Sequence, residues 1–309
     1  MKLITPEFYD RFRCTASRCR HNCCIGWEID IDPDTFELYR NAKNSLSDRF
    51  CNCISSEVQP HFILGENERC PFLNKDNLCD IILEMGEDSL CQICSDHPRF
   101  RNLYSSRVEA GVGLCCEEAC RLLLENEAPL SLHESVIDGE ETDDEYEEQI
   151  FSLRDRVFSL LQDRSRTLCE RTDDMLSMFG AQLPDRSIGQ WAEVYLSLEQ
   201  LDPEWTALLG ELKDAAVENT IAEREYEYEQ FIVYWLFRHF GEAVYDGDVI
   251  SKIRLAALSL RMIRALDALY AAKHGPITKE QRAEHMRMYS AEIEYSQENL
   301  DTLYDILCD

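Results

Sequence analysis

Cysteine is the residue type in this sequence with the most evident chemistry. Four cysteines precede Trp27 in a C-x4-C-x3-C-C pattern, formed by Cys14, Cys19, Cys23 and Cys24. Three further groups follow along the chain: Cys70 and Cys79, Cys91 and Cys94, and Cys115, Cys116 and Cys120. Thiolates are soft ligands for metal ions and iron-sulfur clusters. The pattern therefore predicts a soft-metal site in the N-terminal part of the chain.

The spacing of the cysteines favours an iron-sulfur cluster and leaves zinc as the alternative. Structural zinc usually takes two knuckles with C-x2-C-like spacing, and only Cys91 and Cys94 have that spacing. An iron-sulfur cluster tolerates irregular spacing because its thiolates bind separate irons around a larger core. Cys23 and Cys24 are adjacent and point in different directions, so one of them is expected to serve a second centre or a redox role.

The cell compartment decides whether these thiols pair as disulfides. The chain has 15 cysteines, an odd number, and 13 of them lie before residue 121. Residues 1–10 lack the long apolar run of a signal peptide, and no stretch approaches the length of a membrane span. We therefore expect a cytoplasmic protein that does not enter the membrane and keeps its cysteines reduced.

Acidic residues are concentrated in the second half of the chain. Residues 1–125 carry a net charge of −7, and the remaining residues carry −22 of the total −29. Such a field repels nucleic acid and anionic lipid and attracts lysine-bearing partners. The alternative is an acidic surface that serves only solubility.

Short elements must position the cysteines. Asp32 followed by Pro33 predicts a helix start, and a second helix is expected over 79–85 with Gly86 as its C-cap. The pattern also predicts extended backbone over 108–114 and a helix over 117–126. We expect residues 1–125 to form a cysteine-rich metal-binding domain with short irregular elements, whose stability depends partly on its metal.

The sequence of the second part of the chain predicts helices. Asp138 to Glu148 contains eight carboxylates in eleven residues, which marks residues 126–149 as an acidic linker. Apolar residues then repeat every three to four positions, which predicts an α-helical bundle over 150–309. Its helices are expected from residue 150 onward and over 187–200, 203–219, 224–240, 249–273 and 278–307. The fold class is thus mainly α.

Several common enzyme signatures are absent from the sequence. There is no G-x-x-x-x-G-K-[ST] loop, G-x-S-x-G elbow or H-E-x-x-H pair, and Gly111 and Gly113 lack the third glycine of a dinucleotide fingerprint. The C-x3-C-x2-C pattern of radical S-adenosylmethionine enzymes is missing too, because position 26 is Gly26. These absences leave little support for an ATPase, a Rossmann dehydrogenase, a hydrolase or a zincin.

The groups of cysteines, which we call cysteine stations, and their order along the chain resemble the pattern of the bacterial flagellin lysine N-methylases. The resemblance begins with the C-x4-C-x3-C-C array and the Gly26-Trp27-x-Ile29-x-Ile31-Asp32 that follows it. It continues with Cys70-Pro71-Phe72-Leu73, Leu78-Cys79, Gly86-Glu87, Cys94, Pro98-Arg99 and Cys116-Glu117-Glu118, and it covers about residues 5–125. The family's cysteines correspond to Cys14, Cys19, Cys23, Cys24, Cys70, Cys79, Cys94 and Cys116.

The resemblance implies transfer of methyl from S-adenosylmethionine to lysine ε-amines of flagellin, by a protein that holds a cysteine-ligated 4Fe-4S cluster. Flagellin, or another lysine-rich protein, would be the partner. Cys51, Cys53, Cys91, Cys115 and Cys120 are extra to the family pattern. No motif of the family is evident beyond residue 125.

Methyl transfer to lysine requires a neutral amine, although the free amine has a pKa of about 10.4. A carboxylate or a tyrosine near the cysteines could take the proton, and the candidates are Asp30, Asp32, Tyr39 and Asp96. Each of them is equally suited to capping a helix or binding the backbone.

Two residues are candidates for binding the methyl donor. Trp27 could stack on adenine or face the sulfonium, although closing a small core is the commoner use of such a residue. Arg99 could hold the donor's carboxylate or pair with a local acid. In the bundle, an aromatic stripe at helical spacing is expected to be core: Tyr228, Phe231, Trp235 and His239.

A function without catalysis is the alternative to a methyltransferase. The chain could be a non-enzymatic module that chelates iron or zinc, or that senses redox state, and that binds a partner through its helical domain. Binding of S-adenosylmethionine separates the two readings.

Overall fold

The structure is a computed structural model that describes residues 1–56, 59–140, 142–215, 217 and 223–308. The chain packs into two units. The cysteine unit comprises residues 13–100 and 116–118, and the helical unit comprises residues 1–12, 101–115 and 119–309. The predicted boundaries of 1–125, 126–149 and 150–309 concern domains that fold independently, and they stay a prediction.

The cysteine unit consists of short elements. Its helices are α1 (Pro33–Arg40), α2 (Ser47–Cys53), α3 (Asp80–Met85) and α4 (Gln92–Asp96), with single 3-10 turns at Ala16–Arg18, Glu66–Glu68 and Glu87–Ser89. Strands β2 (Ile54–Ser55) and β3 (His61–Phe62) pair antiparallel. The helix starts follow the sequence: Asp32 accepts a hydrogen bond from the Thr35 amide, with Pro33 in the first turn. Gly86 ends α3 at a φ of 90°, as predicted.

An aromatic core holds these short elements together. The rings of Tyr39 and Phe50 stack with centroids 4.3 Å apart, and Phe72 contacts both Phe50 and Phe62 at 4.8 and 5.0 Å. Cys70 and Cys91 are buried in the same core. Cys24, Cys53, Cys79 and Cys94 pack against it. The thiols are therefore part of the packing of this unit.

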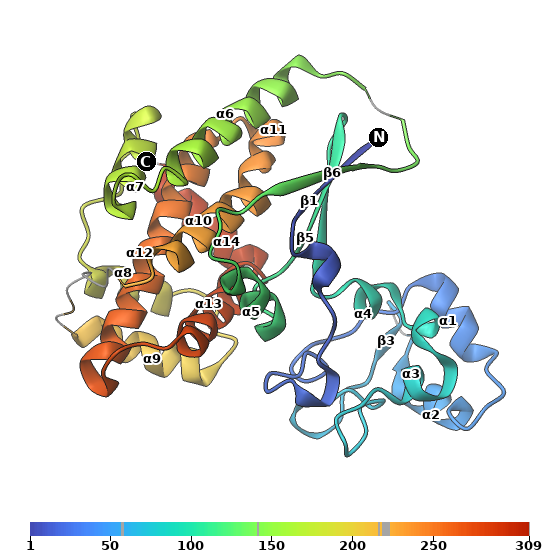
Figure 1. Cartoon of the computed structure of the whole chain (residues 1–309). Coiled ribbons are helices and arrows are strands. Elements are labelled where there is room, and N and C mark those ends of the chain that lie inside the picture. The colour runs from blue at the N-terminus through green and yellow to red at the C-terminus, as the bar shows by residue number, and fades with distance from the viewer. Residues whose placement is uncertain (57–58, 141, 216, 218–222, 309) are drawn as a thin grey trace. The chain divides into compact units, whose positions relative to one another are not determined.

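The helical unit carries most of the chain and confirms that the protein is mainly α (Figure 1). Its helices are α5 (Glu117–Glu125), α6 (Glu145–Leu161), α7 (Leu168–Met178), α8 (Ile188–Leu196), α9 (Pro203–Asp214), α10 (Glu225–His239), α11 (Ala243–Asp246), α12 (Val249–His274), α13 (Lys279–Ile293) and α14 (Gln297–Cys308). Single 3-10 turns occur at Tyr9–Arg11 and Phe240–Glu242.

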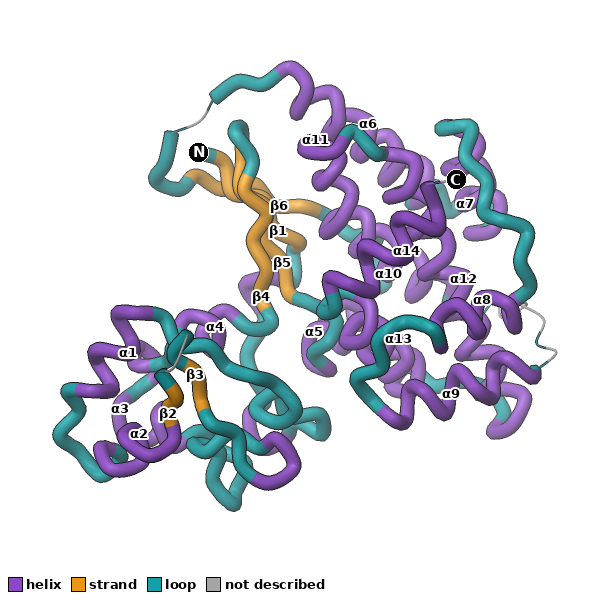
Figure 2. The backbone as a smooth tube through the Cα atoms, turned by 180° about the vertical axis from the view of Figure 1, so that it is seen from behind, coloured by secondary structure: helices purple, strands orange, loops and turns teal. Residues whose placement is uncertain are grey.

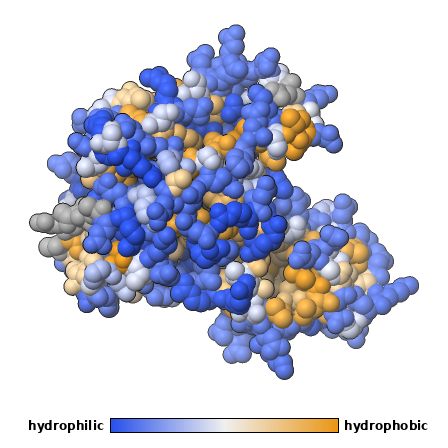
Figure 3. Space-filling view, in the orientation of Figure 1, coloured by the Kyte–Doolittle hydropathy of each residue, from blue (hydrophilic) through white to orange (hydrophobic). Residues whose placement is uncertain are grey.

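Helices α10 and α12 form the centre of this unit. Both are buried on nearly every side, and the predicted aromatic stripe on α10 is core: Trp235 contacts Phe231 at 5.8 Å and His239 at 4.9 Å. A helix that is apolar all round must be enclosed by its neighbours. Hydrophilic side chains cover most of the visible face of the unit (Figure 3).

A four-stranded sheet accompanies the helices (Figure 2). Its strands are β1 (Lys2–Pro6), β4 (Arg99–Leu103), β5 (Arg107–Val112) and β6 (Leu132–Val136), in the order β4-β5-β1-β6. β1 runs parallel to β5 and antiparallel to β6. The sequence predicted extended backbone over 108–114, but it did not predict the sheet.

The predicted helices differ from the observed ones in several places. α2, α7 and α11 were not predicted. The helix predicted over 203–219 ends at Asp214, and residues 216, 218 and 219 of that prediction lie outside the described residues. The helix predicted over 278–307 is divided into α13, which ends at Ile293, and α14, which begins at Gln297. None of the helices in the described part of the chain is long and apolar enough to cross a membrane.

Candidate metal centre

Five of the six cysteines in the core of the cysteine unit also act on one another electrostatically, and we call them the inner thiols: Cys24, Cys70, Cys79, Cys91 and Cys94. The charge of one inner thiol affects the pKa of others, which shows that these thiols lie close together. The charge of Cys70 and that of Cys79 each act on Cys24, and the charges of Cys24 and Cys70 act on Cys94. Cys91 likewise affects Cys70 and Cys79. Segments up to seventy residues apart thus bring their thiols together.

The local backbone explains how the inner thiols meet. Gly26 adopts a φ of +85°, which favours glycine, and its amide bonds the Glu68 carbonyl at 3.1 Å. This turn places the segment that carries Cys24 beside the segment that carries Cys70. The Cys70 amide donates a hydrogen bond to the Cys24 carbonyl at 2.9 Å. Cys79 pairs with Leu73 in an isolated bridge. The first two cysteine stations are thereby joined through main-chain bonds.

Three of the inner thiols lie at the N-termini of helices. Cys79 and Cys91 are the N-cap residues of α3 and α4, and Cys94 lies within the first turn of α4. The thiols of Cys91 and Cys94 are hydrogen-bonded to each other. This bond lowers the pKa of Cys91 and raises that of Cys94, because the pair shares one proton. Burial raises the pKa of Cys70 to about 11.

A second set of thiols lies toward the surface, and we call it the outer thiols: Cys14, Cys19 and Cys23. The charges of Cys23 and Cys14 act on Cys19, whose pKa is raised to about 11 by burial and by Glu117. Cys23 is exposed and bonds both the Cys24 thiol and the His97 ring, and these bonds lower its pKa. Cys23 thus links the two sets. Cys116 belongs to the same unit.

A metal or cluster at the inner thiols stays a prediction. Within residues 1–56, 59–140 and the other described segments, no group of three or more His, Cys, Asp or Glu side chains is arranged to hold a metal ion. A 4Fe-4S cluster takes four thiolates, each on its own iron, so its ligands would stand farther apart than those of one zinc ion.

Two of the four candidate proton acceptors make hydrogen bonds that support the fold of the cysteine unit. Asp32 caps α1, and its pKa is lowered because hydrogen bonds from Gln92 and Thr35 outweigh the effect of burial. The Tyr39 hydroxyl donates to the Ser89 carbonyl at 2.7 Å, and burial raises its pKa. Asp30 is exposed beside His61, and Asp96 lies at the end of α4. All four assignments stay predictions.

The candidate donor-binding residues also lie in the cysteine unit. The Trp27 ring meets His97 edge-on, with centroids 4.7 Å apart. Arg99 begins β4. Their roles toward the donor stay predictions.

Sequence reasoning missed two residues of this centre. Cys91 was set apart as extra to the family pattern, yet it is buried among the inner thiols. Its C-x2-C spacing from Cys94 was the available signal. His97 contacts both Cys23 and Trp27, and no spacing in the sequence pointed to it.

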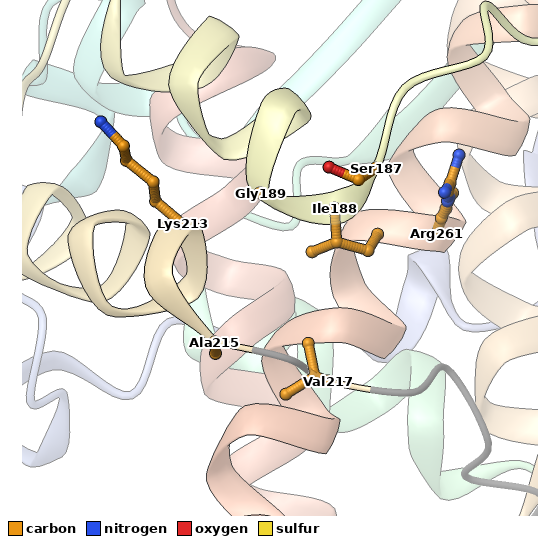
Figure 4. Close-up of a pocket in the computed structure, with 7 residues that line it drawn as sticks. All are labelled: Ser187, Ile188, Gly189, Lys213, Ala215, Val217 and Arg261. Carbon is orange, nitrogen blue, oxygen red and sulfur yellow. The ribbon is translucent and has the colours of Figure 1, made fainter.

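The helical unit contains a pocket of about 440 Å³ at the start of α8 (Figure 4). It is lined by Ser187, Ile188, Gly189, Lys213, Ala215, Val217 and Arg261. Two of its polar side chains have structural roles, because Ser187 caps α8 and Lys213 pairs with Glu193 at 3.0 Å. The pocket contains none of the predicted donor-binding residues.

Comparison with known proteins links the chain to protein methylation. The model of the FliB lysine N-methylase C-terminal domain matches residues 140–309. The chain is 32% identical over 154 residues to the lysine-N-methylase of Salmonella typhimurium, and this match covers 44% of the chain and 37% of the relative. No solved structure matches the chain.

A second relative carries a flagellar name. The flagellar biosynthetic protein FliU of Salmonella muenchen is 29% identical over 147 residues, which cover 43% of the chain and 85% of that protein. The match to the lysine-N-methylase of Salmonella choleraesuis, at 31% identity, again spans 37% of the relative. The chain thus matches little more than a third of the length of these two lysine-N-methylases.

Proposed function

The chain belongs to the FliB lysine N-methylase family, and we propose that it transfers methyl groups from S-adenosylmethionine to lysine ε-amines of flagellin in the cytoplasm. The observation that carries this proposal is the match of residues 140–309 to a domain named for lysine N-methylation. The flagellar name of one relative supports flagellin as the substrate. The net charge of −22 on residues 126–309 suits a lysine-rich partner.

The reaction sets a clear demand on the site. A lysine ammonium must first give up a proton to a base, after which its nitrogen forms a bond to the methyl carbon as the carbon–sulfur bond breaks. The products are the methylated lysine and S-adenosylhomocysteine. Asp30, Asp32, Tyr39 and Asp96 stay the candidate bases, and Asp32 and Tyr39 also make structural hydrogen bonds.

We further propose that the inner thiols hold a 4Fe-4S cluster. Cys24, Cys70, Cys79 and Cys94 are family positions, and Cys91 supplies a fifth thiol. The group would have a structural role, since it would tie together segments that also share a small core. Nucleophilic attack by an amine requires no radical, so the cluster is not needed for radical cleavage of the donor.

A redox module is the second candidate. Two thiol pairs in hydrogen-bond contact favour it, Cys23 with Cys24 and Cys91 with Cys94. Calorimetry with S-adenosylmethionine on anaerobically prepared protein separates the two functions. The methyltransferase binds the donor, whereas a protein that keeps its metal and binds no donor is the redox module.

A further inference from the structure

Strand β6 is an edge strand with a free main-chain side. It is the last strand in the order β4-β5-β1-β6, and it pairs with β1 over five consecutive residues, from Lys2 opposite Val136 to Pro6 opposite Leu132. Figure 1 shows β6 beside β1. Natural edge strands are usually blunted by lysine, proline or a bulge. β6 reads Leu-His-Glu-Ser-Val and its register contains no bulge.

The hydrogen-bond pattern fixes which main-chain groups point outward. Ile137 and Met1 exchange both of their main-chain hydrogen bonds, and the Glu7 amide bonds the Ser131 carbonyl. In an antiparallel ladder such bonded pairs alternate with non-bonded pairs. The odd-numbered residues of β6 therefore bond β1, and the N–H and C=O groups of Leu132, Glu134 and Val136 point away from it.

These outward groups are available to a partner. In the segments that the structure describes, no hydrogen bond reaches the N–H or C=O of Leu132, Glu134 or Val136. The side chains do not cover them either, since Glu134 is exposed and Val136 is 83% exposed. Donors and acceptors that alternate at every second residue match the main chain of another extended segment.

The negative charge on and after β6 indicates which kind of extended segment would pair with it. Glu134 and Val136 share one face of the strand, and the chain continues with Asp138 and Glu140. A second copy of β6 paired in full antiparallel register would place Glu134 opposite itself, which is unfavourable. A segment with a lysine opposite Glu134 and an apolar residue two positions away would instead complement both side chains.

We propose that β6 binds an extended, lysine-bearing segment of the protein substrate as an added strand. This inference rests on the proposed function for the identity of the partner, because a lysine methyltransferase must hold a lysine-bearing chain. The recognised pattern is a lysine and an apolar residue separated by one position. Main-chain bonds supply affinity, and Glu134 with Val136 supplies selectivity.

A proline at position 134 tests the strand addition. Glu134→Pro removes one outward N–H and leaves the β1 ladder bonds of the neighbouring residues in place. The matched control is Glu134→Gln, which keeps the N–H and removes the charge. We expect Glu134→Pro to weaken binding of unmethylated flagellin monomer about tenfold or more, with an unchanged melting temperature. Glu134→Gln should weaken it less and reduce its salt dependence.

Hydrogen exchange supplies a measurement that needs no variant. In the complex of wild-type protein with flagellin, the amides of Leu132, Glu134 and Val136 should become protected. Unprotected amides in the saturated complex, or full affinity of Glu134→Pro, would overturn the proposal while leaving methylation intact. Wild-type dimers that the proline variant lacks would show a second copy on the edge and also overturn it. A wild type that neither binds nor methylates flagellin would instead refute the proposed function and its substrate together.

Discussion

The carboxylate of Asp32 accepts a hydrogen bond from the main-chain amide of Gln92, with 2.8 Å between Oδ2 and N. Its other oxygen accepts from the Thr35 amide at 3.0 Å. One side chain therefore caps α1 and holds the first turn of α4, the helix that carries Cys94. A helix cap thus also positions one of the inner thiols.

Replacing Asp32 should loosen the cysteine unit. We expect Asp32→Ala to lower the free energy of unfolding of this unit by about 1–2 kcal/mol, because an N-cap is lost and the Gln92 amide loses its acceptor. Urea unfolding of the full chain measures the change. Asp32→Asn is the control, since it keeps a capping oxygen, and equal stability of Asp32→Ala and wild type would contradict the assignment.

The same carboxylate makes stability depend on pH. Hydrogen bonds hold the pKa of Asp32 below its ordinary value in the folded chain. Its contribution is therefore fully present above the unfolded pKa of about 3.9, and it is lost as the pH falls through the lower folded pKa. Acid titration should show a smaller loss of stability below about pH 4 for Asp32→Asn than for wild type. Identical acid profiles would exclude this role of Asp32.

The inner thiols should hold the metal. Anaerobically purified wild type is expected to be brown with iron and acid-labile sulfide, and Cys70→Ser and Cys94→Ser should lose both. Cys51→Ser is the matched control, because Cys51 is exposed on α2. Elemental analysis and visible absorbance give the result. Stoichiometric zinc without iron in the wild type would contradict the cluster.

A buried ion pair should stabilise the helical unit. Arg154 binds both oxygens of Glu109 at 2.6 Å, and both side chains are almost completely buried. Arg154→Met removes the bidentate partner of a buried carboxylate, which still has Arg107 at 3.8 Å, and should cost about 3 kcal/mol of unfolding free energy. The double variant Arg154→Met with Glu109→Gln should recover part of that loss. Additive losses in the double-mutant cycle would show that the two residues do not interact.

Local signals allowed part of the fold to be predicted. Asp32 with Pro33 marks the start of α1, and Gly86 marks the end of α3, because caps depend on neighbouring residues only. The sheet depends on distant residues. β1 pairs with strands that lie more than a hundred residues away, and no local pattern reports such pairing. The break between α13 and α14 was not predicted either, because apolar residues continue at helical spacing across it.

The candidate site was predicted to a similar extent. The cysteine stations were evident from their spacing, and four of the eight family positions are inner thiols. Cys91 was not among the predicted ligands because it is extra to the family pattern, and the structure places it in the same core as Cys94, at the C-x2-C spacing that the sequence shows. The division into inner and outer thiols arises from the turn at Gly26 and the bond of Cys70 to Cys24, which only the folded chain reveals.

Substrate binding should weaken as salt rises. The net charge of −22 on residues 126–309 should attract lysine-bearing surfaces over a Debye length of about 8 Å at physiological ionic strength. Association of flagellin should therefore slow as salt is added, whereas dissociation should change less. Stopped-flow fluorescence measures both rates. An association rate independent of salt would remove the acidic surface from recognition.

The central claim is tested most directly by methyl transfer. Anaerobically prepared protein is incubated with isotopically labelled S-adenosylmethionine and unmethylated flagellin of the same bacterium, and the flagellin peptides are analysed by mass spectrometry. We expect labelled methyl groups on lysine side chains and none when S-adenosylhomocysteine is added in excess. Unlabelled flagellin from a protein that retains its metal and binds the donor would contradict it.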